Sequence, residues 1–287
     1  MKTIDEIVQL GIDKHFVKHD VGVKKVKEYQ SLLGLNNDEL YTFFKGNPHL
    51  FEYAVANNSP FCVNAKLNFL VENLAITYND AIKLVKKSPK ILDYDMLNDE
   101  PTSLITKLNF LSKSLNLTQQ ELGQLIQNYP KVLDYDINKG SLSGIRANIS
   151  LLKSWGVTKQ DIISNAMLLA LPASKIRLRY MILNLANPNK NNLLSHDLLK
   201  NEGILYARYR YLNSIKEPWL KSIGASENYF KNKYKVNTPD LLIKYPISEA
   251  AINKLEELFN KQSSDKNWRL TPIEREAVIT KKAEKVV

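Results

Sequence analysis

A pentapeptide recurs in this chain. It reads Lys66-Leu67-Asn68-Phe69-Leu70 and returns as Lys107-Leu108-Asn109-Phe110-Leu111, 41 residues later. The same displacement relates segment 89–95 to segment 130–136, which read Pro-Lys-Ile-Leu-Asp-Tyr-Asp and Pro-Lys-Val-Leu-Asp-Tyr-Asp. Repeats of this length are typical of arrays in which each unit packs on its neighbours. Such arrays present one long surface, so we expect a protein that binds rather than catalyses.

Helix-start signals recur at nearly the same spacing. In each, a short side chain that accepts a hydrogen bond stands three residues before an acid. The pairs are Asn36 with Glu39, Thr77 with Asp80, Thr118 with Glu121, and Thr158 with Asp161. The acid is favoured there because the first N–H groups of a helix are unpaired and the helix dipole is positive at that end. Each pair therefore predicts the start of a helix.

The residues between these caps complete one repeat. Apolar stripes at helical spacing in 67–74 and in 81–85 predict a first and a second helix. The second helix should stop near Ser88, because Pro89 disfavours helical geometry in the residue before it. The apolar pair at 91–92 is then expected to turn back into the core as a short 3₁₀ turn.

The repeat shortens after the third unit. Equivalents of the pentapeptide fall at 148–152, 179–183 and 210–212, so the spacing changes from 41 to 31. Pro172 is displaced from the register of the earlier prolines. Turns are expected at 187–189 and Pro218. Further helices are expected from Ser226, at Thr238-Pro239, from about Ser248 to Asn260, and from a capping box at 271–274 to Lys281-Lys282.

These patterns predict an all-α fold. We expect a superhelical solenoid of repeated helix–helix units with a short 3₁₀ turn, and no segment reads as a strand. The helical-repeat domain should span 1–262. A C-terminal linker and helix should occupy 263–287, with the linker at 262–267.

The repeats resemble the mitochondrial transcription termination factor (mTERF) family over roughly residues 20–250. The similar features are the basic-apolar start of each first helix, the Leu-Thr or Val-Thr cap before the second, and the Tyr-Pro-Lys-Val-Leu ending at 129–133. Segment 226–234 also looks like the C-terminal signature of that family. The resemblance implies a superhelical solenoid whose concave face binds nucleic acid, commonly duplex DNA, in an organelle such as the mitochondrion.

The net charge of +10 is concentrated in one part of the chain. Residues 1–140 contain 16 Lys or Arg and 17 Asp or Glu, a net charge of −1. Residues 141–236 contain 15 Lys or Arg and 5 Asp or Glu, a net charge of +10. Residues 237–287 contain 9 Lys or Arg and 8 Asp or Glu. A basic segment of this kind favours a polyanionic partner.

Five of the seven arginines fall in that basic segment. Arg146, Arg177 and Arg208 are 31 residues apart, and Arg179 and Arg210 form a second row that continues Lys25, Lys66 and Lys107. Equivalent positions of a solenoid align along one face, so these rows predict a ladder of guanidinium groups, which suit phosphate oxygens. The candidate nucleic-acid-binding residues are Arg146, Arg177, Arg179, Arg208, Arg210, Lys175, Lys107 and Lys66.

Tyrosines are interleaved with these arginines. Tyr180, Tyr206, Tyr209 and Tyr211 have the π-faces on which unpaired bases stack. Their helical spacing favours core packing instead. The recurring acids Asp93, Asp95, Asp134 and Asp136 are expected to have a repeated structural role after the proline, in capping or turn bonding, rather than to bind a metal.

No catalytic or cofactor motif is found. His15 and His19 share an i, i+4 spacing but lack a third ligand, and Cys62 has no evident base beside it, so we expect surface histidines and a buried cysteine. Nucleotide-binding glycine loops are missing from a chain with ten glycines. We expect neither enzymatic activity nor a cofactor or metal.

Compartment signals are few. A single cysteine cannot form a disulfide within the chain, which fits a reducing intracellular compartment. The first ten residues include Asp5 and Glu6 and lack an apolar core, so they read neither as a signal peptide nor as an Arg-rich transit peptide. No apolar run approaches the roughly 18 residues of a membrane span.

The sequence therefore favours a DNA-binding helical-repeat protein, expected to be a monomer, that holds a duplex in a basic concave groove and modulates transcription or its termination. RNA, read through stacking on tyrosines, is the second candidate ligand. A solenoid that binds an acidic protein surface instead of nucleic acid is the third alternative.

Overall fold

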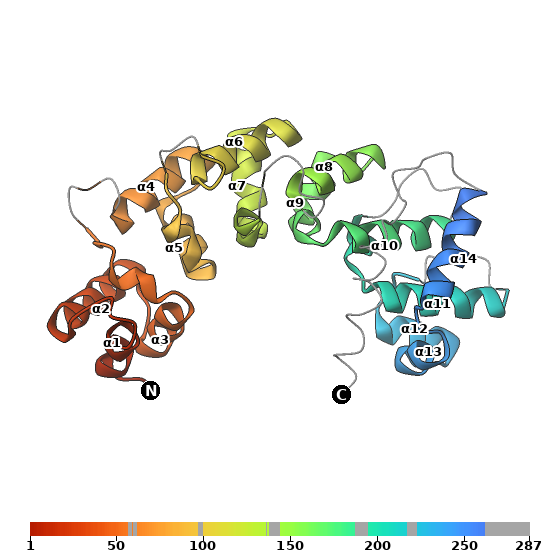
Figure 1. Ribbon diagram of the computed structural model, residues 1–287, viewed down its shortest axis with the longest axis horizontal. Helices are drawn as coiled ribbons and strands as arrows, with labels where there is room; N and C mark the ends of the chain where they lie inside the picture. Colours follow the sequence, from red (N-terminus) through yellow and green to blue (C-terminus); the bar gives the residue numbers. More distant parts are fainter. Residues whose placement is uncertain are drawn as a thin grey trace. The chain divides into compact units, whose positions relative to one another are not determined.

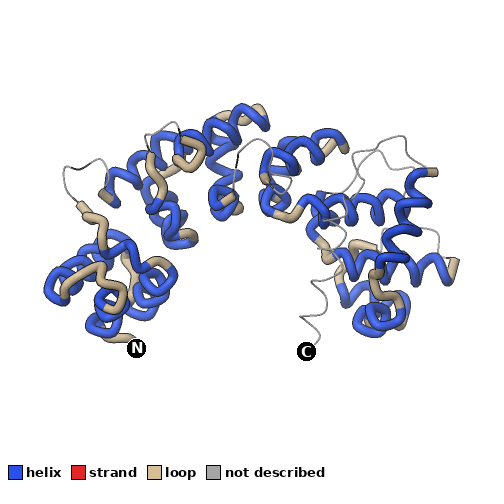
Figure 2. The backbone as a smooth tube through the Cα atoms, viewed as in Figure 1, coloured by secondary structure: helices blue, strands red, loops and turns tan. Residues whose placement is uncertain are grey.

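The computed structural model describes residues 1–56, 59, 62–96, 100–135, 137, 144–186, 195–216 and 223–261. The chain divides into two compact units, 1–138 and 139–287. The division falls next to the boundary at which the charge changes from near neutral to strongly basic. In the described ranges every regular element is a helix and none is a strand (Figure 2), so the predicted all-α class is confirmed.

The first unit contains three successive pairs of α-helices, each followed by a 3₁₀ helix, after an N-terminal helix (Figure 1). Helix α1 spans Ile4–Ile12. The repeats are α2 (His19–Leu33), α3 (Asn37–Gly46) and η1 (Pro48–Phe51); α4 (Val63–Leu74), α5 (Tyr78–Lys87) and η2 (Pro89–Asp93); and α6 (Leu104–Leu115), α7 (Gln119–Asn128) and η3 (Pro130–Asp134).

The four caps predicted from the recurring Asn or Thr form. The side chains of Asn36, Thr77, Thr118 and Thr158 accept hydrogen bonds from the backbone N–H three residues later, at the starts of α3, α5, α7 and α9 (Lys159–Ser164). In α3, α7 and α9 the acid also accepts a bond from the N-cap backbone, which completes a capping box.

The proline acts as predicted. Helix α5 ends at Lys87 with Ser88 as its C-cap, and the chain continues as the 3₁₀ helix η2 from Pro89. Ile91 and Leu92 of η2 are buried. The stripes of the second repeat are also buried: Leu67, Leu70 and Leu74 in α4, and Ala81, Leu84 and Val85 in α5.

The second unit has less regular repeats. Its remaining elements are α8 (Ile145–Ser154), η4 (Ala166–Ala170), α10 (Ala173–Ala186), η5 (Ser195–Leu199), α11 (Glu202–Ser214), α12 (Glu227–Tyr234), α13 (Thr238–Lys244) and α14 (Glu249–Asn260). Helix α9 has 6 residues where α7 has 10. Moreover, α10 begins directly after Pro172, whereas α6 begins well beyond the end of η2. These two differences account for the first shortened interval, from 148 to 179.

Two details concern residues singled out in the sequence. His15 and His19 do not share a helical face, because α1 ends at Ile12, His15 has a left-handed φ of 60°, and His19 begins α2. Both are exposed. Cys62 is buried as expected, and its sulfur also caps α4 by accepting from the N–H of Ala65 at 3.4 Å.

Some predictions lie outside the described residues. These are the turns at 187–189 and Pro218, the acid Asp136, the linker at 262–267 and the final helix of 263–287.

Candidate nucleic-acid interface

The lysines of the recurring pentapeptide point into the fold. Lys66 and Lys107 are each 6% exposed. The Nζ of Lys66 donates to the backbone oxygens of Leu92 and Tyr94, the latter at 3.3 Å. Lys107 repeats these bonds one unit later with Leu133 and Tyr135. Burial lowers the pKa of Lys66, and the carboxylate of Asp93 opposes that shift. Each lysine thus binds the end of the 3₁₀ helix of its own repeat.

A tyrosine and an aspartate connect neighbouring repeats at the same place. Tyr94 donates to Asp134 at 2.8 Å, and Tyr53 donates to Asp93 at 3.2 Å. Burial and the Asp93 carboxylate raise the pKa of Tyr53 to about 12. The amine of Lys107 lies 4.6 Å from the centre of the Tyr94 ring. We call each Tyr–Asp bond, with the lysine over the ring, an inter-repeat latch. The prediction of a repeated structural role for Asp93 and Asp134 is confirmed, but their carboxylates accept bonds from the preceding repeat, where capping or turn bonding was expected.

In the second unit, polar groups of a different kind occupy the lysine position. The Nδ2 of Asn148 donates to the backbone oxygens of Leu169 and Leu171, at 2.9 and 2.7 Å. Arg179 donates to the oxygen of Leu198 at 2.8 Å, and Arg208 donates to that of Ala225 at 2.7 Å.

This pattern corrects the alignment of the arginines. By its bonds, Arg208 continues the row of Lys107 and Arg179, whereas the constant spacing of 31 had aligned it with Arg146 and Arg177. The last interval of that row is therefore 29 residues, and Arg210 does not belong to it. The sequence could not show this change, because it depends on which backbone oxygens each guanidinium group reaches in the fold.

Arg179 is 5% exposed and forms a buried ion pair. Its Nη2 lies 2.8 Å from Glu202, and the Nζ of Lys175 lies 3.4 Å from the other oxygen of that carboxylate. Burial alone raises the pKa of Glu202, but Arg179 and Lys175 together lower it below its ordinary value. Lys175 remains a quarter exposed.

Arg208 is equally enclosed. It is 3% exposed, its Nη2 lies 2.9 Å from Glu227, and its guanidinium lies 4.4 Å from the centre of the Phe230 ring. Arg179 and Arg208, like the two lysines of the first unit, are thus bonded within the fold. Removing any of the four would leave buried groups unpaired.

Three predicted arginines have accessible surface. Arg146 in α8 and Arg210 in α11 are exposed, and Arg177 in α10 is partly exposed. The guanidinium of Arg210 lies 5.9 Å from the centre of the Tyr245 ring and donates to the hydroxyl of Tyr206 at 3.2 Å. Lys244 lies 5.5 Å from the same Tyr245 ring. Arg210 and Lys244 therefore place two positive charges around one tyrosine, where α11 packs on α13.

Helices α12 and α13 carry further basic residues, which the spacing of the repeats does not predict. Lys231, Lys233, Lys235 and Lys244 are exposed. We call these four lysines, with Arg210, the basic cluster. Local density of lysine, four within 231–244, is the signal that points to them.

Three carboxylates of this region are bonded to other groups of the protein, although the side chain of Glu227 is still 47% exposed. Glu202 pairs with Arg179, Glu227 pairs with Arg208, and Asp161 completes the cap of α9. The exposed charge of the described part of 144–236 is consequently positive.

The interleaved tyrosines pack in the core, as their spacing predicted. Tyr206 and Tyr209 are buried. Tyr180 stacks on Trp155 with ring centres 3.9 Å apart, and Tyr211 meets Phe230 edge-on at 6.2 Å. Tyr229, which is 52% exposed in α12, is the tyrosine next to the basic cluster that is available for stacking.

The described residues contain neither a metal-binding group nor a membrane-spanning helix. No group of three or more histidine, cysteine, aspartate or glutamate side chains in these ranges is arranged to hold a metal ion. None of the helices described has the length and apolar character to cross a membrane.

Comparison with known families gives a match. The model of the mTERF family matches residues 14–176, more than half of the chain. No curated protein matches this chain.

Proposed function

Because the chain belongs to the mTERF family, we propose that it binds double-stranded DNA through the basic surface of its second unit and modulates transcription or its termination. Membership implies a nucleic-acid-binding helical-repeat protein, in a family of regulators that are not typically enzymes. The solenoid arrangement of the repeats and the monomeric state are parts of the same proposal.

The choice of this surface rests on which charged side chains are exposed. The carboxylates Glu202 and Glu227 are bonded to buried arginines, whereas Arg146, Arg210 and the lysines of α12 and α13 are exposed. A surface with an excess of exposed cations attracts phosphates and releases their counterions on binding. The proposed contact residues are therefore Arg146, Arg177, Arg210, Lys175, Lys231, Lys233, Lys235 and Lys244.

The salt dependence of binding tests the proposal. If five or six phosphates are neutralised, log affinity should fall against log salt with a slope of about −5 on duplex DNA. Fluorescence anisotropy of a labelled random-sequence duplex at several salt concentrations measures that slope. A complex that is insensitive to salt, or no complex at low salt, would refute nucleic-acid binding by this surface.

Single-stranded RNA is the second candidate, favoured by the exposed Tyr229 among lysines of α12. A base can stack on such a ring, and stacking is worth about 1–3 kcal/mol per base. Competition between duplex DNA and single-stranded RNA at one salt concentration separates the two ligands. Tyr229→Ala should weaken RNA binding selectively if RNA is the ligand.

A further inference from the structure

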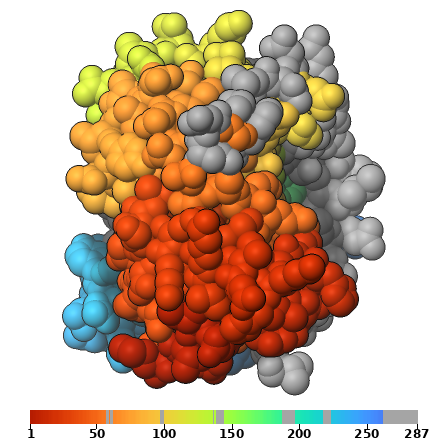
Figure 3. Space-filling model, turned by 90° about the vertical axis from the view of Figure 1, so that its left-hand side faces the viewer, coloured from red at the N-terminus to blue at the C-terminus, as the bar shows by residue number. Residues whose placement is uncertain are grey.

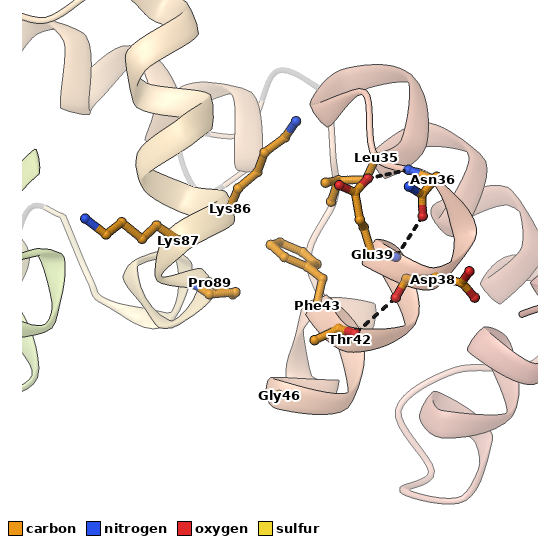
Figure 4. Close-up of a pocket in the computed structure, with 10 residues that line it drawn as sticks. All are labelled: Leu35, Asn36, Asp38, Glu39, Thr42, Phe43, Gly46, Lys86, Lys87 and Pro89. Carbon is orange, nitrogen blue, oxygen red and sulfur yellow. Dashed lines mark hydrogen bonds between the residues drawn. The ribbon is translucent and has the colours of Figure 1, made fainter. Parts of the chain in front are cut away.

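A groove runs between the first and second repeats of unit 1, with a volume of about 680 Å³ (Figure 4). Its apolar part comes from Leu35 and Phe43 on one side and Pro89 on the other. Asp38 and Glu39 line it as well. The carboxylate of Asp38 points away from the groove (Figure 4) and accepts from the N–H of Lys2 at 2.7 Å, and that of Glu39 accepts from the N–H of Asn36 at 2.8 Å. Figure 3 shows the outer surface of this region, where the red residues of the first repeat adjoin the orange residues of the second.

The next pair of repeats contains the equivalent groove. It is lined by Asp80, Lys83, Leu84, Lys87 and Gln127. Subtracting 41 from each gives Glu39, Thr42, Phe43, Gly46 and Lys86, and all five line the first groove. The second groove has a volume of only about 210 Å³.

A lysine occupies the second groove. The Nζ of Lys87 donates to the backbone oxygens of Gln127 and Asn128, at 3.1 and 3.3 Å. These are the last carbonyls of α7, which lack partners within the helix and lie at the negative end of its dipole. An ammonium group is the natural donor for that position.

The first groove lacks this lysine. Gly46 stands at the position of Lys87, and a Cβ added to Gly46 would meet no atom within 4 Å. Thr42 likewise replaces Lys83, so neither basic side chain of the second groove has a counterpart here. Lys87 lines the first groove as well, but its side chain extends away from Gly46 and its Nζ bonds to α7 (Figure 4).

We propose that the first groove binds a lysine side chain of a partner protein, in the position that Lys87 fills in the second. The aliphatic stem would lie on Phe43 and Leu35, and the ammonium group would bind the last carbonyls of α5. The carboxylate of Glu39 favours a cation at the rim. This site lies in the near-neutral unit and gives the protein a contact distinct from its proposed nucleic-acid surface.

The lining includes two lysines, Lys86 and Lys87. Because the Nζ of Lys87 is bonded to α7, the opposing charge left near the groove is that of Lys86. Its counterpart in the second groove is the neutral Gln127. Lys86→Gln should therefore strengthen cation binding about threefold, because it removes a like charge close to the site.

The test uses the full chain and n-butylammonium, which has the shape and charge of a lysine side chain, with n-butanol as the neutral probe. Amide NMR shifts of Thr42, Gly46 and Lys87 should move with n-butylammonium and not with n-butanol at equal concentration. Equal shifts with both probes would show an apolar site and overturn the proposal, as would no shift with either.

Two variants give the matched controls. Gly46→Lys supplies the missing side chain within the protein, so it should abolish the response and raise Tm by about 3 °C. Lys87→Gly opens the second groove, so it should add a new response to n-butylammonium at α7. A Gly46→Lys variant that is folded and still binds n-butylammonium at Thr42 would contradict the assignment.

Discussion

The hydroxyl of Tyr94 donates a 2.8 Å hydrogen bond to the carboxylate of Asp134, which ties the second repeat of the first unit to the third. Both groups lie where each 3₁₀ helix ends. Tyr94→Phe removes the bond and leaves the charged acceptor without this donor, so it should lower the free energy of unfolding by about 2 kcal/mol. Urea denaturation measures the change.

The more exposed latch supplies a comparison for that variant. Tyr53→Phe removes the 3.2 Å bond to Asp93, whose other oxygen still accepts from Asn47 at 2.6 Å. Its cost should be about 1 kcal/mol or less. Equal losses of stability in the two variants would show that the strength of a latch does not depend on its burial.

Lys107 should matter for folding and not for nucleic-acid affinity. Lys107→Met keeps the length of the side chain but removes the donor to the oxygens of Leu133 and Tyr135. We expect a loss of about 2 kcal/mol of stability. Duplex affinity measured well below the melting temperature should stay within twofold of the original. A tenfold loss of affinity in the folded variant would restore Lys107 to the binding surface.

The basic cluster should matter for nucleic-acid affinity and not for folding. Arg210→Gln with Lys244→Gln removes two exposed positive charges around Tyr245. The salt slope on duplex DNA should become shallower by about 2, because each contact contributes about 0.9. Tm should change little. Lys254→Gln in α14 is the control, since Lys254 is exposed outside the cluster.

Gly123 allows α7 to approach α4 closely. A Cβ at this position would lie 2.2 Å from the backbone oxygen of Leu74. Gly123→Ala should therefore destabilise the first unit by about 2 kcal/mol, as overpacking does. Gly46→Ala is the matched control, because its Cβ has open space and alanine favours helix. Chemical denaturation of both variants tests the difference, and equal stability would refute the close contact.

Acid should weaken the second unit through Glu202. Its pKa is lowered in the fold, where hydrogen bonding and charge attraction from Arg179 and Lys175 outweigh burial. The stability it contributes is therefore present above the unfolded-state pKa of about 4.3, and is lost as pH falls through the lower folded value. Thermal melts between pH 3 and 7 should show a shallower acid decline for Glu202→Gln. An unchanged profile would argue against this linkage.

Periodicity in the sequence predicted the scaffold better than the candidate surface. The caps at Thr77 and Thr118 depend on neighbours three residues away, so local sequence was sufficient. The direction of Lys107 depends on where the chain returns 26 residues later, which its spacing does not reveal. The same limitation applies to Arg208. A hydrogen-bond donor that recurs at one position of successive repeats marks a bond that each repeat needs, whereas the exposed lysines of α12 follow no repeat.

The inter-repeat latches also bear on how the first unit comes apart. In a linear array, each repeat contributes its own stability and a coupling to its neighbour, and the ratio of the two decides whether the ends fray. Tyr53–Asp93 and Tyr94–Asp134 strengthen the coupling without adding to either repeat alone. Amide hydrogen exchange in α2 to α7 should therefore share one opening free energy, so that these helices open as a single cooperative block.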